Sequence, residues 1–146
     1  MQHHLILRVI TKLLVGAIML FALYVQFHGD YSPGGGFQAG VIMAVAFILY
    51  GVVFSLRKAQ QVFPPWLVHK LVALGVLLYA GTGVVSMLLG YRFLDYGAFS
   101  PHHPEHGQHW GILIVELGVG ITVTGVMVAI YYAFAARPRR IGDEGW

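Results

Sequence analysis

The sequence predicts an all-α protein, an integral membrane bundle of four transmembrane helices with both termini in the cytoplasm. Three observations support this fold class. The 146 residues are 58% hydrophobic and only 10% charged, whereas soluble domains are about 45–50% apolar and about 25% charged. Several uncharged stretches are long enough to cross a bilayer, and the basic residues gather on one side of them. This composition excludes an ordinary soluble domain, a disordered chain and a nucleic-acid-binding protein, despite the net charge of +3.

Four uncharged stretches locate the helices, at residues 13–29, 31–56, 71–91 and 117–136. A spanning helix needs about 20 mostly apolar residues to cross roughly 30 Å of hydrocarbon. The first stretch is short, but apolar residues extend it back to Leu5. We therefore predict helices at about 5–27, 36–56, 66–90 and 109–136 within a single membrane domain, 1–146. Helices are favoured over strands because a four-stranded sheet could not close and satisfy its backbone in lipid.

The first helix could instead be a cleaved signal peptide, because Arg8 and Lys12 precede an apolar run. A cleaved signal peptide ends in a small-x-small cleavage site. No such site follows Val25, so we expect a retained transmembrane helix.

The basic residues give the orientation. With four spans, eight of the nine Lys and Arg residues lie on one side: Arg8, Lys12, Arg57, Lys58, Lys70, Arg137, Arg139 and Arg140. Only Arg92 lies on the other side, together with Asp30, Asp95 and Glu105. Cytoplasmic loops carry an excess of Lys and Arg, so both termini should face the cytoplasm.

The three connections differ in composition. The first, from His28 to Gly36, is rich in glycine, and we expect a structural turn whose free N–H groups favour a carboxylate such as Asp30. The second contains Pro64-Pro65, a stiff turn that starts the next helix. The third, 91–108, is long and rich in histidine and lies outside.

Glu116 is the first candidate for chemistry, because nothing else charged lies near it in the last predicted helix. An intramembrane carboxylate costs several kcal/mol unless it is paired, hydrated or protonated. It should lie roughly 10 Å below the outer helix end, on the same face as His109. One interpretation is a step in a proton or cation relay. The other is a buried polar contact to a partner subunit.

Lys12 is the second candidate, four residues after Arg8 on one face of the first helix. Its side chain can extend to the cytoplasmic headgroups, and the same anchoring role is expected for Lys70. Lys12 and Glu116 belong to opposite halves of the membrane, so we expect no ion pair between them.

The outer histidines His102, His106 and His109 have a spacing compatible with one helical face and hence with a metal site. Pro104 and Gly107 argue against a continuous helix there, so a structural loop is favoured and no metal is expected. Cysteine is absent, and no histidine lies in the middle of a span to ligate a haem. We therefore expect no cofactor.

The run His28-Gly-Asp-Tyr-Ser-Pro-Gly-Gly-Gly-Phe-Gln-Ala-Gly40 resembles a family signature. The family is MnhB (also called MrpB), one of the subunits of the Mrp-type multisubunit sodium/proton antiporter, and its usual motif is Gly-His-x-x-Pro-Gly-Gly-Gly-Phe. The residues that match are Gly29, Pro33, Gly34, Gly35, Gly36 and Phe37. Asp30 stands where the family usually has histidine, with His28 just before. The stretch Glu116-Leu-Gly-Val119 also resembles the family's acidic residue and the Ile-Gly-Val that follows it in the last helix.

The resemblance implies a multi-pass subunit of the bacterial inner membrane with no catalytic activity of its own. Such complexes exchange sodium or another monovalent cation for protons. The implied partners are the other antiporter subunits, including large pump-like membrane subunits, with the lipid bilayer, sodium ions and protons. The candidates for an ion or proton path are Glu116, His109, Lys12, Asp30 and His28. Two alternatives stay open, a membrane-arm subunit of an energy-converting redox complex such as a hydrogenase, and a purely structural or assembly subunit.

Overall fold

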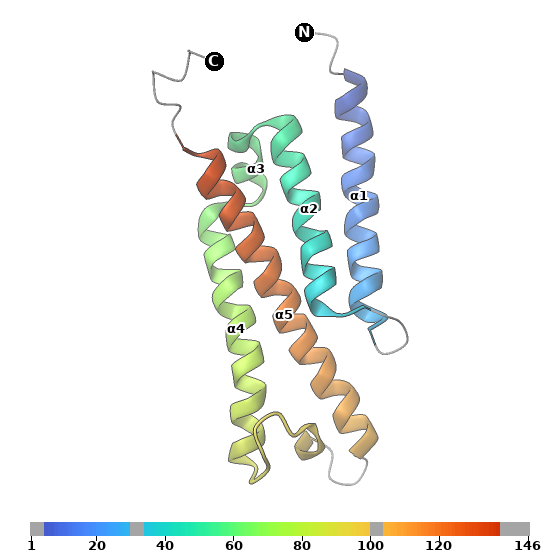
Figure 1. Ribbon diagram of the computed structural model, residues 1–146, viewed down its shortest axis with the longest axis vertical. Helices are drawn as coiled ribbons and strands as arrows, with labels where there is room; N and C mark the ends of the chain where they lie inside the picture. The colour runs from blue at the N-terminus through green and yellow to red at the C-terminus, as the bar shows by residue number, and fades with distance from the viewer. Residues whose placement is uncertain (1–4, 30–33, 100–103, 138–146) are drawn as a thin grey trace, which may run out of the picture.

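A computed structural model describes residues 5–29, 34–99 and 104–137 (Figure 1). Its elements are α1 (Leu5–Phe27), α2 (Gly36–Phe54), α3 (Leu56–Val62), α4 (Pro65–Leu88), the short 3-10 helix η2 (Tyr96–Phe99) and α5 (Pro104–Ala135). Within the described residues, four helices, α1, α2, α4 and α5, are long and apolar enough to cross a membrane. The predicted all-α fold with four helices of membrane-spanning length and hydropathy is therefore confirmed.

Helix α5 occupies the middle of the bundle. It packs along α2 on one side and α4 on the other, while α1 packs mainly against α2 (Figure 1). The start of α1 and the end of α5 lie at the same end of the bundle, as an even number of spans requires. At the opposite end, α4 and α5 extend beyond the end of α1 and the start of α2 (Figure 1). An interior part of α5 therefore lies level with these two helix ends.

Small residues on two faces of α5 explain its central position. Toward α2, a β-carbon added to Gly40 would lie 2.6 Å from the carbonyl oxygen of Gly120. Toward α4, a β-carbon added to Gly118 would lie 2.9 Å from the carbonyl oxygen of Gly75. Neither separation is possible for a larger residue without movement of the backbone. Helices associate in lipid through close approach of this kind, because lipid tails are as apolar as the side chains and burial of apolar surface gives no driving force.

The connection between α2 and α4 is more structured than a simple turn. Helix α2 ends at Phe54, and Ser55 has a φ of 107° that breaks the helix before α3 begins. Exposed Arg57 and Lys58 lie on α3. Pro65 stands in the first turn of α4, where its missing N–H costs nothing, as predicted.

The start of α5 differs from the prediction. Pro104 and Gly107 were expected to exclude a helix there, but α5 begins at Pro104 and runs unbroken through Gly107. Proline is tolerated in the first helical turn because its N–H would have no partner. The loop expected over 91–108 is therefore shorter, and it contains η2. Glu116 consequently lies about 18 Å from the start of the helix at a rise of about 1.5 Å per residue, which is farther than expected.

Apolar side chains cover the outside of the bundle, most extensively on α1. Leu13 and Leu20 of this helix are 72% and 70% exposed. Its buried residues are Thr11, Ala22 and Gln26. A contiguous exposed apolar surface of this kind indicates contact with lipid or with other membrane proteins.

Candidate functional site

The site forms where α5 passes the turn between α1 and α2. The carboxylate of half-buried Glu116 lies between two glycines of this turn. A β-carbon added to Gly29 would lie 2.9 Å from Oε2 of Glu116, and one added to Gly35 would lie 3.1 Å from Oε1. The two glycines therefore leave the space that the carboxylate occupies.

The backbone of the same region holds Glu116 in place. Gly36, the first residue of α2, packs directly on the backbone of Glu116, and a β-carbon there would lie 2.9 Å from the Cα of Glu116. One turn further, the hydroxyl of Thr124 donates to the carbonyl oxygen of Gly40 at 3.1 Å and to that of Gly120 at 2.7 Å. The contact between α2 and α5 thus fixes the height and rotation at which Glu116 meets the turn.

The electrostatics of this position favour a negative charge. Gly35 is the N-cap of α2 and makes no side-chain capping bond. The first N–H groups of a helix have no partner within the helix, and the helix dipole places partial positive charge there. Oε1 of Glu116 lies against this N-cap. The start of α2 therefore offsets part of the cost of a carboxylate inside a spanning helix.

Gln26, in the last turn of α1, is a member of this site that the sequence analysis did not single out. It is 7% exposed, and its Nε2 is a buried atom with no hydrogen-bond partner. Its Oε1 lies against α5, where a β-carbon on Gly120 would be 2.7 Å away. Gln26 and Glu116 both line a small cavity of about 10 Å³, with Phe27, Gly29 and Leu113. A glutamine near the end of an apolar helix gave no sequence signal that it would be buried.

Comparison with known proteins identifies the family. The family model described as "Domain related to MnhB subunit of Na+/H+ antiporter" matches residues 6–129. A protein of Staphylococcus haemolyticus strain JCSC1435, named for antiporter subunit mnhB2, is 34% identical over 92% of this chain and 96% of its own. The mnhB2 protein of Staphylococcus aureus strain Newman is 34% identical over 88% of this chain and 92% of its own. The chain belongs to the MnhB family.

The family motif and the acidic residue of the last helix meet in this MnhB chain. Gly29, Gly35 and Gly36 contact Glu116, whereas Gly34 packs on Val25 of α1, with a β-carbon 3.2 Å from Cγ1. Asp30 and Pro33 lie outside the described residues. Phe37 is 64% exposed on the outside of α2.

The other predicted path residues lie apart from the carboxylate. Lys12 is exposed on α1, and its Nζ lies 5.8 Å from the centroid of the Phe54 ring, at the opposite end of α2 from Gly36. It does not meet Glu116, as expected. His28 is exposed at the end of α1 and stacks on Tyr24, with ring centroids 4.3 Å apart.

The outer histidines form no metal site within the described residues. His106 and His109 are exposed on α5, and His109 contacts the edge of Trp110 at a centroid distance of 6.3 Å. His102 lies outside the described residues. No group of three His, Cys, Asp or Glu side chains in the described ranges is arranged to hold a metal.

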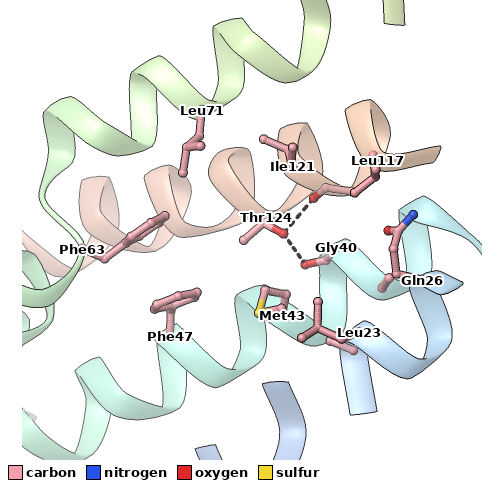
Figure 2. Close-up of a pocket in the computed structure, with 13 residues that line it drawn as sticks. Leu23, Gln26, Gly40, Met43, Phe47, Phe63, Leu71, Leu117, Ile121 and Thr124 are labelled. Atoms are coloured by element: carbon pink, nitrogen blue, oxygen red, sulfur yellow. Dashed lines mark hydrogen bonds between the residues drawn. The ribbon is translucent and has the colours of Figure 1, made fainter. Parts of the chain in front are cut away.

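A larger cavity of about 220 Å³ lies on the other side of Gln26 (Figure 2). It extends between α1, α2, α4 and α5 and ends near the stacked rings of Phe47 and Phe63, whose centroids are 4.5 Å apart. Its lining is almost entirely apolar, with Gln26 and Thr124 as polar side chains. Gln26 thus separates the carboxylate from an apolar interior.

Proposed function

We propose that this chain is a membrane subunit of a bacterial Na+/H+ antiporter and that Glu116 takes up and releases protons on the path of the exchanger. Its membership of the MnhB family and its four membrane-spanning helices support the subunit assignment. One observation carries the role of Glu116. Its carboxylate belongs to the interior of a spanning helix and lies between Gly29 and Gly35 of the family motif.

The arrangement suits a group that changes its charge. The charged form gains from the start of α2, and the neutral form gains from the apolar surroundings. Each protonation state of Glu116 therefore has surroundings that stabilise it. Irregular backbone at membrane depth is tolerated where it is buried in protein or lines a water-filled space. Gly29 and Gly35, the described backbone beside Glu116, are half-buried in this way.

Other subunits of the antiporter are the implied partners. The exposed apolar surface of α1 offers a face for them or for lipid. Lys12, Arg57 and Lys58 belong to the end of the bundle away from Glu116. By the excess of basic residues on cytoplasmic loops, this end faces the cytoplasm. Glu116 is then reached from the outer half of the membrane.

The test uses everted membrane vesicles that contain the whole complex. Sodium-driven proton movement is measured for Glu116→Gln and Glu116→Asp and divided by the amount of assembled complex. We expect Glu116→Gln to abolish exchange and Glu116→Asp to retain part of it, because only the latter can still ionise. Asp95→Asn, which neutralises a carboxylate outside the predicted spans, serves as the matched control. If Glu116→Gln exchanges normally per complex, the proposed role is wrong; if it only prevents assembly, Glu116 is a packing contact.

A further inference from the structure

Gln26 lies between two cavities of different character. The smaller cavity of about 10 Å³ is shared with Glu116, and the larger one is apolar. A volume of roughly 10–15 Å³ at this measure is what a single water molecule needs, provided that polar groups surround it. The small cavity meets this condition through the carboxylate of Glu116 and the amide of Gln26.

The amide is oriented by its contact with α5. Its oxygen lies against Gly120, and in Figure 2 its nitrogen is on the side away from Phe47, Phe63 and the apolar interior. A buried amide N–H without a partner is costly, and such groups are normally satisfied by protein or ordered water. The unpartnered Nε2 therefore indicates that a hydrogen-bond acceptor belongs beside it.

We infer that the small cavity binds one water molecule, which accepts a hydrogen bond from Nε2 of Gln26 and donates one to the carboxylate of Glu116. Gln26 is thus a positioning residue that acts on Glu116 through this water. A proton added to the water moves to the carboxylate, leaving a neutral water molecule and a neutral carboxyl group. Release reverses the step. This inference rests on the proposed role of Glu116 and adds the group through which its proton travels.

The same geometry argues against a sodium ion in this cavity. An amide N–H presents hydrogen atoms and partial positive charge, which repel a cation but suit a water oxygen. The cavity also has room for about one water-sized molecule, too little for a hydrated ion. The cavity therefore suits a water molecule better than a sodium ion.

Other titratable groups stand on the elements packed around Glu116. Tyr24 and His28 belong to α1 and the turn after it, and His106 and His109 to the first turns of α5. Tyr79 belongs to α4 near Gly118, and Tyr96 of η2 packs on α5 at Gly111. The first half of α2 carries none. The test must therefore observe the Glu116 carboxyl group itself and not only the pH dependence of exchange.

The variant Gln26→Met keeps the length of the side chain but removes the amide. Gln38→Met, at an exposed glutamine in the first turn of α2, is the matched control. We expect Gln26→Met to raise the pH of half-maximal exchange by about one unit, because a bond that stabilises the carboxylate is lost. The sodium concentration for half-maximal exchange should not change. An unchanged pH profile would overturn the inference, and a raised sodium requirement alone would show that the cavity holds the cation instead.

Infrared difference spectroscopy of the purified complex gives an independent readout. The carboxyl band of Glu116 is assigned by its loss in Glu116→Gln and should shift in Gln26→Met but not in Gln38→Met. In the unmodified complex, a water band that titrates with Glu116 should shift in heavy-oxygen water. This measurement does not require any variant to assemble. Absence of that water band refutes the inference. The bands report the water and the carboxyl group whether or not exchange depends on them. A missing water band would therefore refute this inference alone, whereas normal exchange by Glu116→Gln would refute the proposed function.

Discussion

Glu116 and Gly29 are neighbours in space although they lie far apart in the sequence. A β-carbon added to Gly29 would stand 2.9 Å from Oε2 of Glu116. The glycine motif of the first connection is therefore one wall of the site that contains the acidic residue of the last helix. The two features form one site, in which the glycines leave the space and the carboxylate that fills it carries the charge.

Gly29→Ala should reduce exchange while the fold stays intact. The added methyl group displaces the end of a flexible side chain rather than backbone, so the carboxylate can move aside at low cost. Exchange per assembled complex should fall, and the melting temperature of the purified complex should stay within a few degrees of the parent, since a change of about 1 kcal/mol corresponds to only a few degrees. Unchanged exchange would mean that the position of the carboxylate does not matter.

Gly36→Ala should act on stability instead. Its methyl group would collide with the backbone of Glu116, which cannot move without separating α2 from α5. We expect a loss of about 1–3 kcal/mol, typical of overpacking, seen as a lower melting temperature and less assembled complex. Gly16→Ala is the control, because nothing lies within 4 Å of a β-carbon at that position. Equal behaviour of the two variants would contradict the close packing of α2 on α5.

Thr124→Val should weaken the contact between α2 and α5 by a smaller amount. The substitution removes the 3.1 Å hydrogen bond to Gly40 while nearly preserving shape. Hydrogen bonds between membrane helices are worth about 0.6 kcal/mol on average, so we expect a modest fall in resistance to denaturing detergent. Thr82→Val, whose hydroxyl bonds to Leu78 and Tyr79 within its own helix α4, should change less. The reverse order would show that the bond to Gly40 is not stabilising.

The absence of cysteine makes the orientation directly measurable. Single-cysteine variants Lys58→Cys on α3 and Arg92→Cys in the outer connection are both at exposed positions. In intact cells, a membrane-impermeant maleimide should label Arg92→Cys at once and Lys58→Cys only after permeabilisation. The opposite labelling pattern would show that the bundle has the opposite orientation and that Glu116 lies in the inner half of the membrane.

Sequence reasoning predicted the spans well because their signal is local. Length, hydropathy and the Pro64-Pro65 turn act within one segment, and α1, α2, α4 and α5 follow from them. The start of α5 was mispredicted because Pro104 was treated as a helix breaker rather than as a first-turn residue. The charge pattern singled out Glu116 and the resemblance supplied the glycine motif, but as separate features.

The parts that sequence reasoning missed depend on contacts between distant segments. Nothing near Gly29 or Gly35 indicates that a carboxylate fills the space beside them, because that carboxylate comes from α5. Gln26 was missed for the same reason. Its burial follows from the close approach of α1, α2 and α5 and not from its immediate neighbours in the sequence. Such sites become visible only when the packing of the helices is known.

The most direct measurement of the central claim is sodium-driven proton movement by the purified complex in sealed liposomes, with Glu116→Gln compared with the parent at equal amounts of assembled complex. The account predicts a signal no larger than that of empty liposomes for Glu116→Gln and partial exchange for Glu116→Asp. Full exchange by the assembled Glu116→Gln complex would contradict it.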